Sequence, residues 1–183
     1  MTSLNEVSLP NSFDFVYTLA INNVSPTLSS IIPYQNSSSI DSLPSSSVNV
    51  TIPSNLWMNI SSISTLLNRF TDMERLEIGD YDLETVKEFH LNGMSKLQVI
   101  EIGKNSFTST PNSNGFDEQR SFEILNCQEL ESITIDDYSF SDCASTFEIR
   151  SCPNLVSIQL GRMTFFNVLE VTIQSNYISS DSS

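Results

Sequence analysis

The sequence predicts a repeat solenoid, a fold in which successive coils of the chain stack into one column. Three observations predict it. Apolar residues recur in a fixed frame, the frame returns about every 24 or 25 residues, and each copy holds two short segments in which apolar and polar residues alternate. Because one such coil cannot bury both apolar rows by itself, we expect the coils to stack strand on strand, as a right-handed superhelix with a parallel β-sheet on at least one side.

The frame reads L-x-x-I-x-I-G-x-x-S-F, then F-x-I, and begins again at a leucine. All 24 positions of its four copies are apolar, whereas a hydrophobic content of 39% would fill about nine. The copies are Met73, Leu76, Ile78, Leu83, Phe89, Leu91; Leu97, Ile100, Ile102, Phe107, Phe122, Ile124; Leu130, Ile133, Ile135, Phe140, Phe147, Ile149; and Leu155, Ile158, Leu160, Phe165, Val171, Ile173. We therefore expect about four coils over residues 73–176.

The spacing of the copies locates one insertion. Phe122 and Phe147 are 25 residues apart, but Phe89 and Phe122 are 33 apart. The extra residues fall in TSTPNSNGFDEQRS, residues 108–121, where Pro, Asn and Gly indicate a surface loop.

A capping helix is expected before the first coil, over residues 54–72. Its apolar stripe would consist of Leu56, Ile60, Ile63, Leu67 and Phe70, with Pro53 and Ser54 as the start signal. Such a helix could close the N-terminal end of the column.

Residues 1–53 form a weakly ordered region in this interpretation. Ten serines lie between Ser25 and Ser47, a composition that buries too little to offset its ordering entropy. Residues 13–21 and 48–52 alternate like strands, and two pairings are open for them: with each other, or with the sheet that follows. Residues 177–183 are expected to be a disordered tail.

The composition excludes several classes of partner. With 22 acidic and 8 basic residues, a net charge of -14 gives neither nucleic acid nor an anionic membrane surface a basic patch to bind. There is no apolar run of membrane-spanning length and no signal-peptide pattern, so the default expectation is a cytoplasmic protein. Four glycosylation triplets, at Asn23, Asn36, Asn49 and Asn59, would suit the alternative of a cell-surface location, although a serine-rich stretch also generates such triplets by chance.

Residues 97–107, LQVIEIGKNSF, resemble the leucine-rich-repeat consensus L-x-x-L-x-L-x-x-N-x-L. The short period and the I-x-I-G and S-F-x-x-C patterns are most similar to the BspA-like branch, found in microbial and protist proteins. Tyr138 and Met163 stand where the first motif has Asn105, so a second alignment remains open, with the ladder at Met94, Cys127, Cys152 and Asn176. The resemblance implies a protein-binding module without catalytic activity or cofactor; the alternative is a microbial adhesin or host-contact protein.

Two outward columns are the candidate binding faces, because the middle residue of I-x-I and of F-x-I points away from the core. The first column is acidic at one end, which favours a partner with a basic patch. The first face consists of Glu77, Glu101, Thr134 and Gln159, flanked by Arg75, Val99, Ser132 and Ser157 and rimmed by Asp80, Lys104, Asp137 and Arg162; the second consists of His90, Glu123, Glu148 and Thr172. The last coil shows no evident cap, so we also expect self-association through that end.

Catalytic and metal sites are not expected. His90 is the only histidine and no G-x-S-x-G turn accompanies it. The three cysteines lack zinc-site spacing, and Asp136, Asp137 and Asp142 lack the calcium-loop pattern. The outward Glu123 and Glu148 would lie one coil apart without a sugar-binding cleft. Cys127 and Cys152 occupy equivalent positions and should stack, as thiols or, in an oxidising compartment, as a disulfide.

Overall fold

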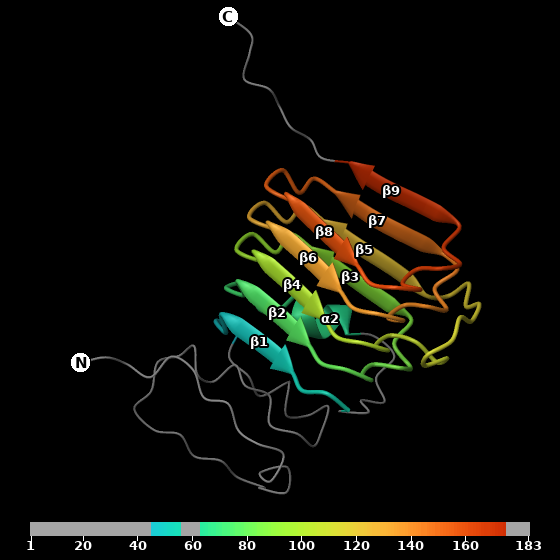
Figure 1. The fold of residues 1–183 in the computed structure, drawn as a ribbon. Helices are drawn as coiled ribbons and strands as arrows, with labels where there is room; N and C mark the ends of the chain where they lie inside the picture. The colour runs from blue at the N-terminus through green and yellow to red at the C-terminus, as the bar shows by residue number, and fades with distance from the viewer. Residues whose placement is uncertain (1–44, 56–62, 175–183) are drawn as a thin grey trace, which may run out of the picture.

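The structure is a computed structural model that describes residues 45–55 and 63–174 of the 183-residue chain. These residues form a β-solenoid of about five turns, in which two parallel sheets face each other across the core (Figure 1). The first sheet contains β1 (Asn49–Ile52), β2 (Arg75–Ile78), β4 (Val99–Ile102), β6 (Ser132–Ile135) and β8 (Ser157–Leu160); the second contains β3 (Glu88–Asn92), β5 (Ser121–Leu125), β7 (Thr146–Arg150) and β9 (Glu170–Gln174). We call them sheet A and sheet B.

The predicted stacking of equivalent residues is confirmed by the strand register. In sheet A, Ile102 pairs with Ile135, which pairs in turn with Leu160. In sheet B, Phe122 pairs with Phe147 and Phe147 with Val171. Each turn therefore lays its I-x-I segment and its F-x-I segment directly on those of the turn before.

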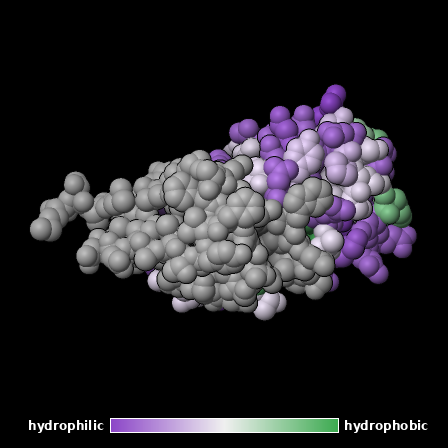
Figure 2. Space-filling model, turned by 90° about the horizontal axis from the view of Figure 1, so that it is seen from below, coloured by the Kyte–Doolittle hydropathy of each residue, from purple (hydrophilic) through white to green (hydrophobic). Residues whose placement is uncertain are grey.

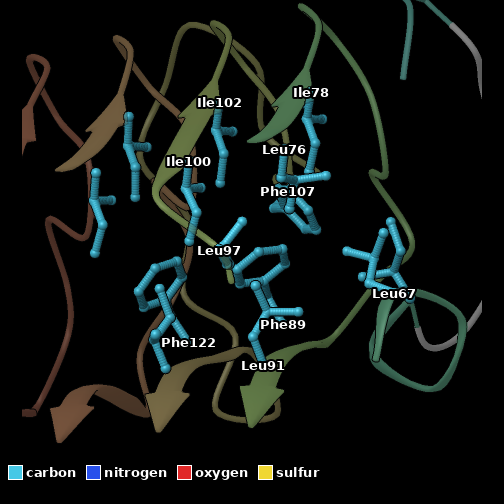
Figure 3. Close-up of a cluster of buried hydrophobic side chains, with 14 of the residues drawn as sticks. Leu67, Leu76, Ile78, Phe89, Leu91, Leu97, Ile100, Ile102, Phe107 and Phe122 are labelled. Atoms are coloured by element: carbon cyan, nitrogen blue, oxygen red, sulfur yellow. The ribbon is translucent and has the colours of Figure 1, made fainter. Parts of the chain in front are cut away.

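The core lies between the two sheets and is built around two interleaved stacks of aromatic rings. Figure 3 shows the sheet A residues Leu76, Ile78, Ile100 and Ile102 pointing toward Phe89, Leu91 and Phe122 of sheet B. Rings of Phe89, Phe122 and Phe147 stack with centroids 5.2 and 5.1 Å apart. Phe107, Phe140 and Phe165, from the corners between the sheets, form a second stack at 4.5 and 4.9 Å. Edge-to-face contacts join the two stacks, an arrangement that aromatic quadrupoles favour.

Burial follows the apolar frame until the last turn. All 18 frame residues of the first three copies are buried. In the fourth copy only Phe165 is buried, while Leu160, Val171 and Ile173 are 46%, 59% and 56% exposed. No described turn follows β9, so these residues have neighbours on one side only.

The column begins earlier than the sequence predicts. Of the two pairings left open for residues 48–52, the structure shows the second: β1 pairs with β2, and Val50 and Ile52 align with Leu76 and Ile78. This turn precedes residue 73, which is why the described chain has about five turns instead of four.

The expected capping helix over residues 54–72 is wrong in its described part. Helix α2 is a single turn, Ser64–Leu67, while residues 54–55 and 68–72 are not helical and residues 56–62 lie outside the described residues. The described residues of the predicted apolar stripe nevertheless pack into the core, since Ile63, Leu67 and Phe70 are fully buried. The β-branched and serine content of this segment gives a helix little intrinsic support, so packing and not propensity places it.

Helix α2 takes the place of a strand beside β3, and side chains of this region form hydrogen bonds with the backbone at the outer edge of sheet B. The Ser64 hydroxyl donates to Glu88 O (3.2 Å) and accepts from His90 N–H (2.7 Å). The Asn68 amide donates to His90 O and accepts from Asn92 N–H, both at 3.1 Å. Two side chains thus replace the backbone groups of a neighbouring strand and protect this edge from further pairing.

The corners between the sheets repeat one unusual conformation. Non-glycine residues with left-handed backbone recur in pairs, two positions apart, after each sheet A strand from β2 on; the pairs are Tyr81 and Leu83, Asn105 and Phe107, Tyr138 and Phe140, and Met163 and Phe165. Between the members of two pairs lie buried serines: Ser106 donates to Gly79 O (2.7 Å) and Ser139 to Gly103 O (2.5 Å). The Ser139 hydroxyl also accepts from Ser106 N–H at 3.0 Å, which links one turn to the next. The S-F pair of the frame is therefore a corner that joins turns by hydrogen bonds.

Two expectations fall outside the described part of the chain. Most of the serine-rich region (residues 1–44) and the tail (177–183) are not described. Within residues 45–55 and 63–174, no helix has the length and apolar character needed to cross a membrane.

Charging the core should unfold the column, and charging its surface should not. Ile133 is fully buried, whereas its neighbour Thr134 points outward and is half-buried. We expect Ile133→Asp to lower the free energy of unfolding by at least about 4 kcal/mol, because the carboxylate has no partner there. Thr134→Asp, the matched control, should change it by less than about 1 kcal/mol. Urea denaturation followed by circular dichroism measures both, and equal effects of the two substitutions would contradict the assigned strand orientation.

Candidate functional site

Sheet A presents the first predicted face as one aligned column. Glu77, Glu101, Thr134 and Gln159 occupy corresponding positions on successive strands, as predicted, and the structure adds Thr51 of β1 at the head of the column. The predicted flank of Arg75, Val99, Ser132 and Ser157 is likewise in register and is extended by Asn49. The two columns give a continuous surface of mainly polar side chains on hydrogen-bonded strands.

The charge on this face is less acidic than the sequence suggests. Arg75 forms an ion pair with Glu101 of the next strand, and each side chain is 41% exposed. Glu77 is exposed and, among residues 45–55 and 63–174, has no ion-pair partner. The acidic character of sheet A is therefore concentrated at Glu77, because the charge of Glu101 is compensated across the strands.

The predicted rim residues serve mainly to connect turns. The Asp80 carboxylate accepts a hydrogen bond from Lys104 N–H at 2.8 Å, and Asp137 accepts one from Arg162 N–H at 2.7 Å. The guanidinium of Arg162 lies 5.1 Å from the ring centre of Tyr138, within cation-π distance. Asp80 and Asp137 are thus structural acceptors, which leaves the cations Lys104 and Arg162 as the exposed part of the rim.

Sheet B presents the second predicted column, His90, Glu123, Glu148 and Thr172, in register. Glu148 is paired with Arg150 on its own strand. The imidazole Nε2 of His90 lies 2.8 Å from the Ser121 hydroxyl and 3.8 Å from Glu123 Oε1. Serine and carboxylate both approach the same ring nitrogen, whereas a catalytic triad needs them on opposite nitrogens. This arrangement is a hydrogen-bond cluster on the outward face of sheet B.

A buried ion pair that sequence reasoning missed fastens the 108–121 loop. Arg120 is completely buried, and its Nε lies 2.8 Å from Asp142 Oδ1. The guanidinium also donates to the carbonyl oxygens of Glu84 and Val86. Asp142 Oδ2 accepts from the N–H (2.9 Å) and the hydroxyl (2.7 Å) of Ser109. We call the contacts of Arg120, Asp142 and Ser109 the clasp. The clasp joins the two ends of the loop to the next turn and to the turn before.

The clasp explains one of the aspartates considered as a calcium ligand. Asp142 is buried against Arg120, Asp137 accepts from Arg162, and Asp136 points to solvent. Within the described residues, no three His, Cys, Asp or Glu side chains are grouped to hold a metal ion. The signal that could have identified the clasp is the 22-residue separation of Arg120 and Asp142, close to one repeat.

Asp117 extends the clasp toward the surface. Partial burial alone would raise the pKa of Asp117, but hydrogen bonds from Lys87 and from Gln119 N–H, with the charges of Lys87 and Arg120, hold this pKa below its ordinary value. The ionised carboxylate consequently stabilises the fold above the ordinary carboxyl pKa, and that stabilisation is lost as pH falls through the lowered value.

The three cysteines are buried free thiols, and two of them form a stacked pair. Cys127 and Cys152 lie at equivalent corners after β5 and β7, next to Met94 at the corner after β3. A hydrogen bond with the Cys152 thiol, followed by burial, raises the pKa of Cys127 well above its ordinary range. Cys143 donates to Arg120 O at 3.0 Å, and burial raises its pKa to about 11.

The surface seen from below Figure 1 is mainly hydrophilic wherever it is formed by described residues (Figure 2). In this view, strongly hydrophobic residues, coloured green, show most clearly as small patches at the right-hand margin. The larger apolar exposure belongs to the C-terminal end of the column, where Val156, Phe166 and Leu169 are 85%, 56% and 73% exposed.

Removing the clasp cation should destabilise the whole column. Arg120→Met leaves Asp142 buried beside a neutral side chain, and we expect a loss of about 3 to 5 kcal/mol in the free energy of unfolding. The double variant Arg120→Met with Asp142→Leu should recover part of this loss, because no charge then remains buried. Chemical denaturation of the three proteins at pH 7 measures the coupling, and additive losses in the double variant would refute the pairing.

Cys143 should be nearly inert to alkylation in the folded protein. With a pKa of about 11, roughly one thiol in a thousand is ionised at pH 8, and only the thiolate reacts. Iodoacetamide labelling followed by peptide mass spectrometry should show Cys143 modified at least about 100-fold more slowly than in urea, since denaturation restores both exposure and the ordinary pKa. Comparable rates in both conditions would contradict its buried position.

Comparison with known proteins yields no relative: no family model matches this chain, and neither the curated proteins nor the solved structures contain a significant match. The assignment as a β-solenoid accordingly rests on the register of its strands and the burial of its apolar frame.

Proposed function

We propose that this protein is a protein-binding module of the leucine-rich-repeat type, and that the outward face of sheet A is its contact surface. One observation carries the proposal: ten outward side chains stand in two aligned columns on five hydrogen-bonded strands. The backbone fixes the positions of these side chains, so binding a partner would cost little conformational entropy in this protein. Repeat proteins in general use such extended surfaces to bind other macromolecules.

The side chains on this face are suited to a polar interface. Asn49, Thr51, Thr134 and Gln159 are short or amide side chains that donate and accept hydrogen bonds. They lie beside the Arg75–Glu101 pair, whose charges remain partly exposed. A folded domain with a flat, hydrogen-bonding surface fits this face better than a deeply inserted peptide would, because the face is a continuous sheet.

Charge favours a partner with a basic patch. The chain carries a net charge of -14, which creates a long-range field for positively charged proteins. On the face itself, Glu77 is the uncompensated carboxylate among the described residues and would meet a lysine or arginine of the partner. The electrostatic contribution should act mainly on the association rate and weaken with salt.

The leucine-rich-repeat assignment belongs to this proposal and is supported by residues 97–107, where consensus and strand β4 coincide. One feature departs from the family pattern. Asn105 exchanges hydrogen bonds with Asn112 of the loop, and the residues at the equivalent corners are Tyr81, Tyr138 and Met163. The row Met94, Cys127 and Cys152, buried after the sheet B strands, is the better counterpart of a family ladder.

Reversing the charge of the face should weaken binding to the partner. We expect the double variant Glu77→Lys with Glu101→Lys to lose at least about tenfold in affinity for its partner, equivalent to about 1.4 kcal/mol. Glu118→Lys with Glu129→Lys is the matched control, because both glutamates are exposed and neither lies in a sheet A strand. Arg75→Ala, which breaks the ion pair but keeps both carboxylates, separates loss of the pair from reversal of charge.

The measurement is affinity capture with each purified protein as bait, quantitative mass spectrometry of the captured proteins, and titration of the leading candidate against wild type and variants. A partner lost from the face variant and retained by the control supports the proposal. Equal capture by the face variant and wild type would remove sheet A as the contact surface.

A further inference from the structure

The C-terminal end of the column is an open docking surface. Strand β8 pairs only with β6 and β9 only with β7, so within the described residues the outer edges of both sheets have no neighbour. Apolar side chains that every earlier turn buries are exposed beside these edges. A cavity of about 220 Å³ opens between them and is lined by Ile149, Cys152, Leu155, Ile158 and Ile173, among others.

Residues 4–24 carry the side-chain frame of one complete turn. All six frame positions hold apolar residues, whereas a hydrophobic content of 39% would place an apolar residue at about two of them. They are Leu4, Val7, Leu9, Phe13, Leu19 and Ile21. The spacing from Phe13 through Leu19 and Ile21 equals that from Phe165 through Val171 and Ile173. Three residues separate Leu9 from Phe13 where four separate Leu160 from Phe165, so the first corner is one residue shorter.

The corner residues of this segment agree with the structure of the other turns. Asn11, Ser12 and Phe13 repeat the order of Asn105, Ser106 and Phe107, the corner with two left-handed residues around a buried serine. Asn23 stands at the position of Asn126, which also has positive φ. Asparagine tolerates this conformation better than most residues.

The C-terminal end accommodates such a turn, and the N-terminal end does not. A complete turn needs an open edge on both sheets. At the N-terminal end, Ser64 and Asn68 of the α2 region already satisfy the outer backbone groups of β3. At the C-terminal end, by contrast, Leu160, Val171 and Ile173 are 46%, 59% and 56% exposed.

The linker has the length that this position requires. The outermost strand would lie five strand spacings beyond β1, or about 24 Å. Residues 25–47 number 23 and are rich in serine. A random coil of that many residues has a root-mean-square end-to-end distance of about 26 Å. A tether matched to the distance gives an effective concentration in the millimolar range and favours the segment of the same chain over that of a second copy.

We propose that residues 4–24 of the same chain form the turn that covers β8 and β9 and fills the cavity at the end of the column. In this position Val7 and Leu9 extend the rows that end at Ile158 and Leu160, and Leu19 and Ile21 those that end at Val171 and Ile173. Val24 takes the place next to Cys152, which lines the cavity. Ser8 becomes the next residue of the sheet A column, after Gln159.

A cross-linking experiment on the full chain tests the position directly. In the proposed arrangement, residues 8 and 159 are adjacent outward residues on parallel strands, about 5 Å apart, a separation that a disulfide spans. Ser8→Cys with Gln159→Cys should form an intramolecular disulfide on mild oxidation, seen as a shifted monomer band on a non-reducing gel and confirmed by peptide mass spectrometry. Ser8→Cys with Thr51→Cys, the same probe against the N-terminal end, should not, and each single substitution reports the background of the buried native cysteines.

Two results of this experiment would overturn the proposal. A cross-link between positions 8 and 51 would place the segment on β1. A dimer band from the 8 and 159 pair would show that a second copy covers the end, which is self-association. Neither result bears on the proposed binding function, which uses the outward face of sheet A.

Hydrogen exchange provides a second test that does not depend on cysteine chemistry. Leu19→Asp should release the segment and increase amide exchange in β8 and β9 at least tenfold, while β2, β4 and β6 keep their protection. Ala20→Asp, whose side chain would face outward beside Thr172, should leave β8 and β9 as in the wild type. Unchanged exchange in the Leu19→Asp protein would overturn the proposal.

Discussion

The structure depends on one constraint, the alignment of apolar rows from turn to turn. A turn of about 24 residues has two short strands and no core of its own, so each row becomes buried only when the next turn repeats it in register. The two phenylalanine stacks express this constraint most clearly. Phe122 touches aromatic rings of its own stack above and below and of the second stack beside it. A register shift of one residue would turn these rings to solvent.

The same constraint explains why certain polar groups are buried between neighbouring turns. Buried serines at the corners donate to carbonyl oxygens of the preceding turn, and the Arg120–Asp142 pair adds a further connection between turns at the 108–121 loop. Both devices connect neighbouring turns, and both are needed because a corner that leaves the sheet must satisfy its backbone elsewhere. The stacking of turns does not depend on the outward side chains of sheet A in this way. These side chains can therefore serve as a contact surface for a partner.

Much of the fold was predictable from the sequence, because side-chain spacing alone specifies the stacking. The 18 inward residues of residues 73–149 were identified from their spacing, and the outward columns of both sheets followed from strand alternation. The turn that begins with β1 was not identified, because α2 stands in the place of its F-x-I strand and the frame is incomplete there. Left-handed corners at Phe107 and Phe140 could not be foreseen, since bulky residues rarely adopt positive φ and only the repeated geometry enforces it. The ion pairs escaped prediction for a related reason: Arg75 with Glu101 and Arg120 with Asp142 meet across turns, and sequence reasoning had placed their partners as surface charge or cation ligands.

Methyl nuclear Overhauser spectroscopy on protein labelled at isoleucine and leucine methyl groups tests the stacking most directly. The structure predicts cross-peaks between Ile100 and Ile133 and between Ile102 and Ile135, which are paired on adjacent strands. It predicts none between Ile102 and Leu160, which lie two strands apart at roughly 10 Å. Cross-peaks that connect these residues in any other order, or their absence between adjacent turns, would contradict the solenoid itself.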